Sequence, residues 1–311
     1  MKLGIAVVYL VSPRDEKLLR LHLDQIEKCT RISYTIYAAA NRLLPQFRPL
    51  LEANPRVRIC ECPDTTARDS EEHCFYLERL FQAALQDGCT HIATLHVDSF
   101  PIRPGWAEDL AGKLSDTCPL AAVMIDEQFD HKPNTACLFF TSDFCERYRP
   151  GLLLSEEERS TPMYAEYRRA FAHIPDSGVG FGFKLYSMGL SWYPLERSDL
   201  SRDRSVFGGI FGGMIFHLGG GAWFDLHYHH SAPANAPGAL GTAFLRGYYR
   251  FVLRAAGLIP ARLRPMFRPV KRLEQAVRRR TANRIRRDIY ERERKQLLDD
   301  PEAYFQHLQG R

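Results

Sequence analysis

Short apolar runs rich in β-branched residues alternate with amphipathic stretches through about the first 145 residues, and this alternation limits the possible folds most strongly. The first cycle is an apolar run at 3–10 followed by the stretch 17–28, whose leucines recur at helical spacing. Such alternation is typical of α/β domains with a mainly parallel sheet between layers of helices, so we predict a doubly wound, Rossmann-like α/β fold. The predicted strands are 3–10, 33–41, 57–62, 91–100 and 119–126, the predicted helices are 17–28, 71–88 and 107–115, and 136–148 is predicted as a strand passing into a helix.

The bulk composition indicates a globular chain without a membrane span. The chain has 311 residues, of which 45% are hydrophobic and 25% charged, and no apolar run reaches the roughly 18 to 20 residues that cross a bilayer. The first ten residues lack a basic region and a cleavage site, so we expect a strand there rather than a leader. The eight cysteines have no disulfide-framework spacing, which favours reduced thiols and a cytoplasmic location.

One cysteine cluster offers two interpretations. Cys60, Cys62, His73 and Cys74 could form a zinc site, or they could be small thiols packed in the domain. Structural zinc sites use wider ligand loops, so we favour the second interpretation.

The apolar run at 91–100 contains a polar break, His96-Val97-Asp98. An aspartate at the end of a strand commonly caps a turn. In doubly wound sheets, however, ligands bind beyond the carboxyl ends of the strands, and Asp98 follows a strand predicted to be central. This position favours a binding role for Asp98.

The second half of the chain has a different pattern. A glycine-broken helix and a small strand are predicted within 174–199, and 207–225 is rich in glycine with large apolar residues between. Residues 237–311 are predicted to form a basic helical extension. From residue 246 onward there are 18 Lys and Arg against 7 Asp and Glu, a net charge of +11, which leaves −6 on the rest of a chain whose total is +5.

Three segments together resemble the nucleotide-sugar-dependent glycosyltransferases of the GT-A fold, in particular family 2-like members. They are HVDSFPIRPGW at 96–106, DSGVGFGFKLYSMGLSWYPL at 176–195 and IFHLGGG at 215–221. The first is similar to the DXD-type motif at the end of the central strand, with His96 where the family has its first aspartate. The resemblance covers about residues 1–230. It implies a GT-A domain at 1–236, with a nucleotide-binding half at 1–118 and an acceptor and metal half at 119–236.

The resemblance implies a divalent cation, Mn²⁺ or Mg²⁺, which stabilises the leaving diphosphate of the nucleotide sugar. Asp98, His217 and His96 are the candidate metal ligands. Imidazole beside carboxylate suits Mn²⁺ better than an all-oxygen set would, although Mg²⁺ remains an alternative. For His217 the competing interpretation is a hydrogen-bonded core histidine.

Catalysis and donor binding are assigned to further residues. Asp176 is the candidate base that takes the proton of the acceptor hydroxyl; the alternatives are a helix N-cap or a carboxylate that orients the sugar. We expect nucleotide contacts at strand exits and before the long helix, where loop polarity and capping are the competing explanations. The candidate nucleotide-binding residues are Tyr9, Ser12, Asn41, Arg68, Asp69, His96 and Asp98.

Three other features have less specific interpretations. The glycines of GVGFGF follow no N-terminal strand, which argues against a dinucleotide-binding turn. His227, His229 and His230 could bind zinc, but we favour loop residues at the rim of the cleft. The basic extension could pack on the domain, lie on an anionic membrane surface, or bind nucleic acid, and the absence of a recognition motif makes the last the least favoured.

The resemblance therefore implies a hexosyltransferase-type enzyme that moves a sugar from a nucleotide-diphosphate sugar to a glycan or lipid-linked acceptor, in surface polysaccharide or glycoconjugate synthesis. Its expected location is the cytoplasm, with a peripheral position at the inner face of the membrane as the alternative. The rival hypotheses are a non-catalytic nucleotide- or glycan-binding protein with a degenerate transferase fold, a nucleotidyltransferase, and an adaptor that acts through the basic extension.

Overall fold

The structure is a computed structural model that describes residues 1–10, 14–124, 131–171, 177–199, 208–219 and 290–310. The chain divides into two compact units, 1–221 together with 294–311, and 222–293. The sequence placed 237–311 in one extension, whereas residues 294–311 belong to the first unit. The second unit lies almost entirely outside the described residues, as do Ser12, Asp176, His227, His229 and His230.

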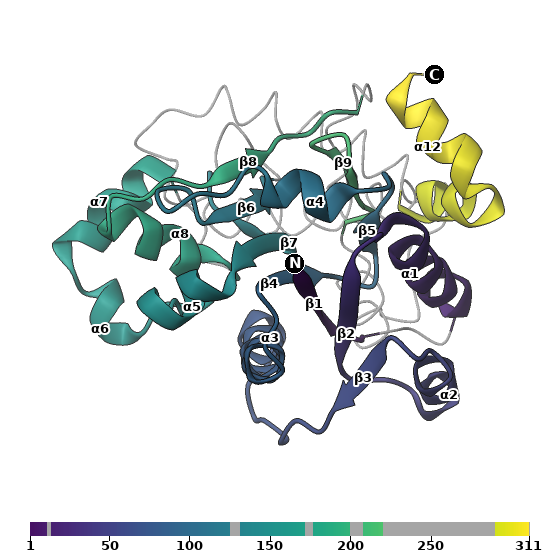
Figure 1. Cartoon of the computed structure of the whole chain (residues 1–311), viewed down its shortest axis with the longest axis horizontal. Helices are drawn as coiled ribbons and strands as arrows, with labels where there is room; N and C mark the ends of the chain where they lie inside the picture. Colours follow the sequence, from purple (N-terminus) through teal and green to yellow (C-terminus); the bar gives the residue numbers. More distant parts are fainter. Residues whose placement is uncertain (11–13, 125–130, 172–176, 200–207, 220–289, 311) are drawn as a thin grey trace, which may run out of the picture. The chain divides into compact units, whose positions relative to one another are not determined.

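A seven-stranded, mainly parallel sheet forms the centre of the first unit, as predicted (Figure 1). The strand order is β3-β2-β1-β4-β7-β6-β8, and β7 is the strand that runs antiparallel to its neighbours β4 and β6. The strands are β1 (Lys2–Val8), β2 (Ser33–Ala39), β3 (Val57–Cys60), β4 (His91–Leu95), β6 (Leu120–Val123), β7 (Asn134–Thr141) and β8 (Tyr193–Leu195). The sheet is therefore mixed, with the four parallel strands β3, β2, β1 and β4 side by side.

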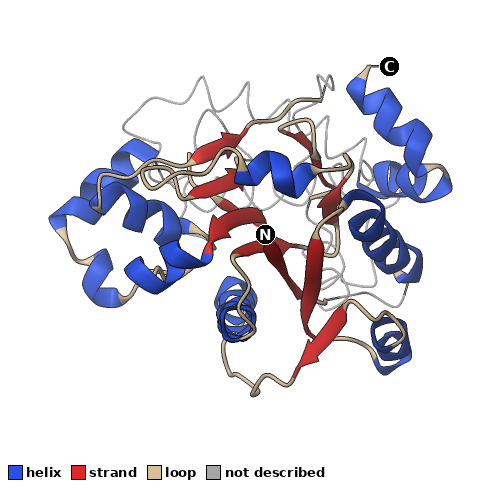
Figure 2. Cartoon of the chain, in the orientation of Figure 1, coloured by secondary structure: helices blue, strands red, loops and turns tan. Residues whose placement is uncertain are grey.

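Helices cover both faces of this sheet (Figure 2). Alternate residues of β1 point to opposite faces, so that Leu3, Ile5 and Val7 join one core cluster and Ala6 joins the other. The first cluster includes apolar residues of α1 (Glu16–Cys29), α2 (Arg48–Glu52) and α4 (Trp106–Ala111). The second includes residues of α3 (Asp69–Gln86), α5 (Ser142–Tyr148) and α8 (Val179–Ser187). A 3-10 turn, η1, spans Pro45–Phe47.

A second sheet of three short strands lies next to the end of β4. Its order is β5-β10-β9, with β5 at Ser99–Pro101, β9 at Gly209–Phe211 and β10 at Ile215–His217. The sequence predicted one strand over 91–100, but the chain leaves the large sheet at Leu95 and enters the small one at Ser99. The Ser99 hydroxyl bonds the carbonyl of Ala136 and accepts from the backbone N–H of His96, which fixes the break.

Two helices between β7 and α8 were absent from the sequence prediction. They are α6 (Glu156–Arg159) and α7 (Pro162–Phe171). A capping box begins α6, because Ser155 and Glu158 each bond the backbone N–H of the other. The aromatic residues Tyr164 and Tyr167 pack α7 against Phe183 of α8, with ring centroids 5.4 and 5.7 Å apart.

The C-terminal residues pack against the small sheet. Residues 290–299 are helical, and α12 follows at Pro301–Gln309. Arg294 forms an ion pair with Asp15, and both side chains are largely buried. The ring of Phe305 lies 5.3 Å from Phe216 of β10 and 6.2 Å from Phe100 of β5. Within the described residues, no helix has the length and apolar character needed to cross a membrane.

Candidate functional site

The candidate site begins where β4 ends. His96, Val97 and Asp98 form a turn in which the N–H of Ser99 donates to the carbonyl of His96, at 2.9 Å. The chain then forms β5, whose Ser99 is paired with His217 of β10. The N–H of Leu218 donates to the carbonyl of Asp98 at 2.8 Å. This ladder places the side chains of Asp98 and His217 side by side, although they are far apart in the sequence.

His96, Asp98 and His217 bring their ligand-type atoms within 4.8 Å of one another. Nε2 of His217 lies 3.7 Å from Oδ1 of Asp98, which is too long for a hydrogen bond. Two ligands that share one ion at about 2.1 Å lie roughly 3.0 to 3.6 Å apart, so the observed separation is close to that of a shared cation. Asp98 and His217 are buried, and His96 is half-buried.

The protonation states fit a cation-binding site. Burial lowers the pKa of His217, against the opposing effect of Asp98. Burial, together with the imidazoles of His73, His217 and His22, holds the pKa of His96 well below its usual value. Both rings are therefore neutral near pH 7, the form that binds metals. Nδ1 of His217, the ring nitrogen other than the one that faces Asp98, is buried and has no hydrogen-bond partner among the described residues.

Two hydroxyl groups that the sequence analysis missed hold His96 in place. Nε2 of His96 lies 3.1 Å from Oγ1 of Thr135, and the same hydroxyl lies 3.1 Å from Oγ of Ser177. The hydroxyl of Thr94 donates to the carbonyl of Thr135 and accepts from the N–H of Leu138, each at 2.8 Å. The ends of β4, β7 and α8 are thus joined at the site. No local pattern indicates this connection, because it depends on how β7 pairs with β4.

The GVGFGF segment forms the first turns of α8 and packs tightly there. Gly178 has a φ of +89°, and a Cβ at this position would lie 2.3 Å from the carbonyl oxygen of Pro133. A Cβ at Gly180 would lie 2.2 Å from the carbonyl oxygen of Gly151. Close backbone approach therefore explains these glycines, in agreement with the rejection of a dinucleotide-binding turn. Ser177 precedes this helix, and the predicted base Asp176 lies just outside the described residues.

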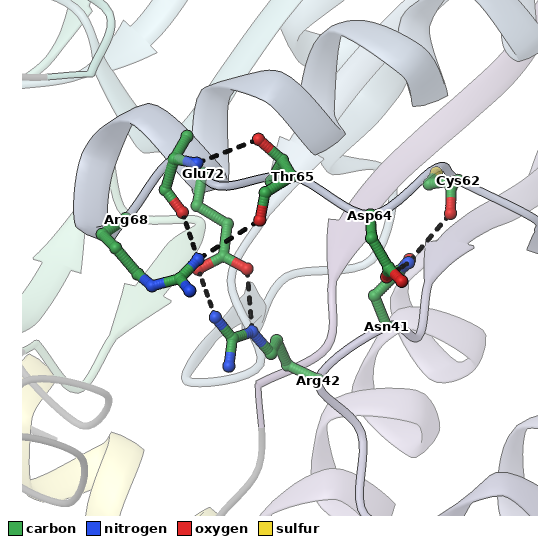
Figure 3. A network of polar contacts seen from close by, with 8 residues as sticks. Asn41, Arg42, Cys62, Asp64, Thr65, Arg68 and Glu72 are labelled. Carbon is green, nitrogen blue, oxygen red and sulfur yellow. Dashed lines mark hydrogen bonds and ion pairs between the residues drawn. The ribbon is translucent and has the colours of Figure 1, made fainter.

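The predicted nucleotide-binding residues at the ends of β2 and β3 form a polar network (Figure 3). Nδ2 of Asn41 donates to the carbonyl of Cys62 at 2.9 Å, and Arg42 makes a two-pronged ion pair with Glu72 at 2.8 and 3.1 Å. Arg68 instead donates to the backbone carbonyls of Thr65 and Ala67, at 3.2 and 2.7 Å. Among the described residues, the exposed guanidinium of Arg68 has no carboxylate partner.

Asp69 and Tyr9 have contrasting environments. Asp69 begins α3 with a φ of +54°, a conformation uncommon outside glycine and concentrated at functional sites. Tyr9 is wholly buried in the core cluster, with its ring 5.7 Å from that of His22. The sequence predicted that Tyr9 would contact a nucleotide at the exit of β1. The structure places Tyr9 just after β1 with its side chain buried, and its contact with a nucleotide stays a prediction.

The cysteine cluster does not form a zinc-type set. Among the described residues, His96, Asp98 and His217 are the group of three or more candidate ligands that comes together. All eight cysteines are free thiols, and Cys74 is buried while Cys60 and Cys62 are half-buried. The ring of His73 lies 5.0 Å from that of His96, so α3 contributes an imidazole to the surroundings of the candidate site.

Comparison with known proteins finds no matching family profile and no matching curated protein. Solved structures similar to this chain include several glycosyltransferases. Galactosyltransferase LgtC, solved with donor and acceptor sugar analogs, is 11% identical over 62% of this chain and 73% of its own, with a TM-score of 0.38. TarS of S. aureus, solved with UDP-GlcNAc, is 9% identical over 50% of this chain and 51% of its own, with a TM-score of 0.36.

A third similar structure is β-1,4-galactosyltransferase 7 of Drosophila, solved with manganese, UDP-Gal and xylobiose. It is 12% identical over 62% of this chain and 64% of its own, with a TM-score of 0.34. This chain thus spans about half of TarS and under two thirds of the Drosophila enzyme. At these scores the likenesses carry no argument about function, and the strand order of the chain itself defines its mixed α/β fold.

Proposed function

We propose that this chain is a metal-dependent glycosyltransferase that transfers a sugar from a nucleotide-diphosphate sugar to a glycan or lipid-linked acceptor. The observation that carries the proposal is the grouping of His96, Asp98 and His217 where the central strand β4 ends. Ligands of α/β sheets bind at this edge. Sequence motifs resembling those of GT-A glycosyltransferases lie at the same positions.

His96, Asp98 and His217 would hold the cation, which neutralises charge that develops on the leaving diphosphate when it is bound. Two neutral imidazoles and one carboxylate favour Mn²⁺ over Mg²⁺, because Mg²⁺ prefers oxygen ligands. Thr135 positions the His96 ring by its hydrogen bond to Nε2. The neutral state of both histidines leaves a ring nitrogen able to bind metal at pH 7.

The donor nucleotide is proposed to bind over the ends of β2 and β3. Arg68 is the candidate for a diphosphate contact, since its guanidinium bonds only backbone carbonyls and can turn toward an anion. Asn41, Asp69 and Ser12 remain proposed contacts to the base and ribose. Asp98 would connect this region to the cation.

The acceptor is proposed to approach the start of α8. Asp176 remains the proposed base, and its neighbour Ser177 is hydrogen-bonded to Thr135 in the candidate site. In an inverting reaction the Asp176 carboxylate would take the proton of the attacking hydroxyl. A hexose donor, a role in surface polysaccharide synthesis and a position at the inner face of the membrane complete the proposal. The support for the membrane position is the positive charge of the sequence from residue 246 onward, most of which lies outside the described residues.

The proposal is tested by donor hydrolysis and transfer, followed with a panel of nucleotide-diphosphate hexoses in the presence of Mn²⁺, Mg²⁺ or a chelator. We expect one donor to turn over with metal, and Asp98→Asn to reduce that rate by about a hundredfold or more. Asp109→Asn is the matched control, because Asp109 is an exposed carboxylate paired with Arg103. Metal-independent turnover, or full activity in Asp98→Asn, would contradict the proposal. Binding of a nucleotide without turnover of any donor would favour the non-catalytic rival.

A further inference from the structure

An open groove lies on the helical segment between β7 and α8. It has a volume of about 710 Å³. Its lining, here named the arginine groove, consists of Arg159, Pro162, Tyr164, Ala165, Arg168 and Arg169. The three arginines are exposed, whereas Tyr164 is 6% exposed and forms part of the floor.

The arginines of the groove lack the partners that other arginines of this chain have. Arg42, Arg197 and Arg294 are each paired with a carboxylate. Across the described ranges of the chain, none of the three groove guanidinium groups makes an ion pair or a hydrogen bond. Three like charges in the lining of one concavity, with no carboxylate in that lining, favour the binding of anions there.

The acidic residues of α6 and α7 are Glu156, Glu157, Glu158 and Glu166, and none of them lines the groove. The carboxylate of Glu158 accepts the N–H of Ser155 at 2.9 Å in the capping box of α6. Burial and the neighbouring Glu166 raise the pKa of Tyr186, so the Glu166 carboxylate lies near Tyr186 of α8. The charged residues of the groove lining are therefore the three arginines alone.

The groove combines fixed and adaptable parts. Pro162, Ala165 and Arg169 follow the helical spacing i, i+3, i+7 and share one side of α7. The ring of Tyr164 is held by Phe183 at 5.4 Å and by Tyr167 at 6.4 Å, so it is a rigid surface. Planar guanidinium groups bind carboxylate and phosphate through paired hydrogen bonds. A small apolar floor beneath them suits the C–H face of a sugar ring better than a lipid tail.

We propose that the arginine groove binds an acidic glycan, through carboxylate or phosphate groups carried on its sugars. The inference rests on the proposed function, because it assigns the class of acceptor that the transferase would extend. Arg169 is eight residues from Ser177, so the groove and the candidate site are at most about 29 Å apart along the chain, a span that an extended glycan covers. The net charge of −6 on residues 1–245 disfavours nucleic acid, whose dense charge requires a broadly basic surface.

Binding is tested on the full chain with four labelled probes, by fluorescence anisotropy at low and high salt. The probes are an octamer of galacturonic acid, a glucose octamer of the same length, a phosphorylated mannose oligosaccharide, and a ten-residue oligothymidine. Vesicles containing an anionic phospholipid form a fifth arm. We expect the galacturonate or the phosphorylated glycan to bind in a salt-dependent manner, and the glucose octamer to bind at least tenfold more weakly.

The double variant Arg168→Gln, Arg169→Gln should weaken glycan binding by about tenfold or more, as should Arg159→Gln to a lesser degree. Arg149→Gln, an exposed arginine outside the groove, is the control and should bind as the wild type does. Equal binding by the groove variants, or preference for oligothymidine, vesicles or the neutral octamer, would overturn the inference. Mn²⁺-dependent nucleotide binding, measured on the same samples, tests the proposed function separately. Absence of this binding in the wild type would refute the proposed function. The groove variants should bind the nucleotide as the wild type does.

Discussion

Phe305→Ala tests how firmly the last helix supports the strand that carries His217. Phe305 is 8% exposed, and its ring contacts Phe216 and Phe100 at centroid distances of 5.3 and 6.2 Å. Replacing a buried phenylalanine by alanine costs about 3 to 5 kcal/mol when the surroundings cannot close the cavity. Because α12 has nine residues and can shift toward the gap, we expect the lower end, about 3 kcal/mol of unfolding free energy.

The assay is urea unfolding followed by tryptophan fluorescence, with Mn²⁺ affinity measured on the same variants. Gln306→Ala is the matched control on the exposed side of α12 and should change stability by less than about 0.5 kcal/mol. Phe305→Leu should recover a large part of the loss, because it refills most of the cavity. Phe216 precedes His217, so we also expect Phe305→Ala to weaken Mn²⁺ binding about tenfold.

Two results would refute this reasoning. The first is a stability for Phe305→Ala within about 1 kcal/mol of the wild type, which would mean that α12 does not support the small sheet. The second is unchanged Mn²⁺ affinity in a clearly destabilised variant, which would separate the packing of Phe216 from the position of His217.

Three further predictions concern the tight backbone contact, the hydroxyl link and a buried histidine. Gly180→Ala should lower the unfolding free energy by about 2 to 3 kcal/mol in urea titrations, because its Cβ meets the carbonyl of Gly151 at 2.2 Å; Gly112→Ala, with neighbours at 3.5 Å or more, should be neutral, and equal effects would argue against the contact. Thr135→Val should weaken Mn²⁺ binding by about 10- to 100-fold in calorimetry while Thr135→Ser preserves it, and equal affinities would remove Thr135 from the site. Burial lowers the pKa of His22 to about 3; the unfolded chain binds this proton below about pH 6.5 and the folded chain does not, so the unfolding free energy decreases as the pH is lowered below about 6.5. His22→Gln should reduce the loss between pH 7 and pH 5 by about 2 kcal/mol, and an unchanged loss would contradict the assignment.

The sequence predicted the central sheet well because its strands and helices have strong local patterns. The run 3–10 became β1, and the leucines of 17–28 became the buried side of α1. Gly88, with a φ of +71°, follows α3 as its predicted stop. These elements are determined by hydrophobic periodicity and by turn residues, which are visible in a single chain.

The features that the sequence did not reveal depend on long-range pairing. The run 91–100 reads as one strand, yet it divides because Ser99 bonds the carbonyl of Ala136. Thr135 and Ser177 have no motif of their own and reach His96 only through the pairing of β7 with β4. The docking of Phe305 on Phe216 likewise joins distant segments. The proposed roles of Asp176 and Ser12 remain predictions, because both residues lie outside the described part of the chain.

The most direct test of the central claim is calorimetric titration of the protein with a panel of nucleoside diphosphates, with and without Mn²⁺, for the wild type and for Asp98→Ala. The proposed function predicts that one nucleotide binds the wild type in a Mn²⁺-dependent manner and that Asp98→Ala abolishes this binding while remaining folded. The base of that nucleotide would also identify the donor. Absence of nucleotide binding to the folded wild type, or binding that is independent of both Mn²⁺ and Asp98, would contradict it.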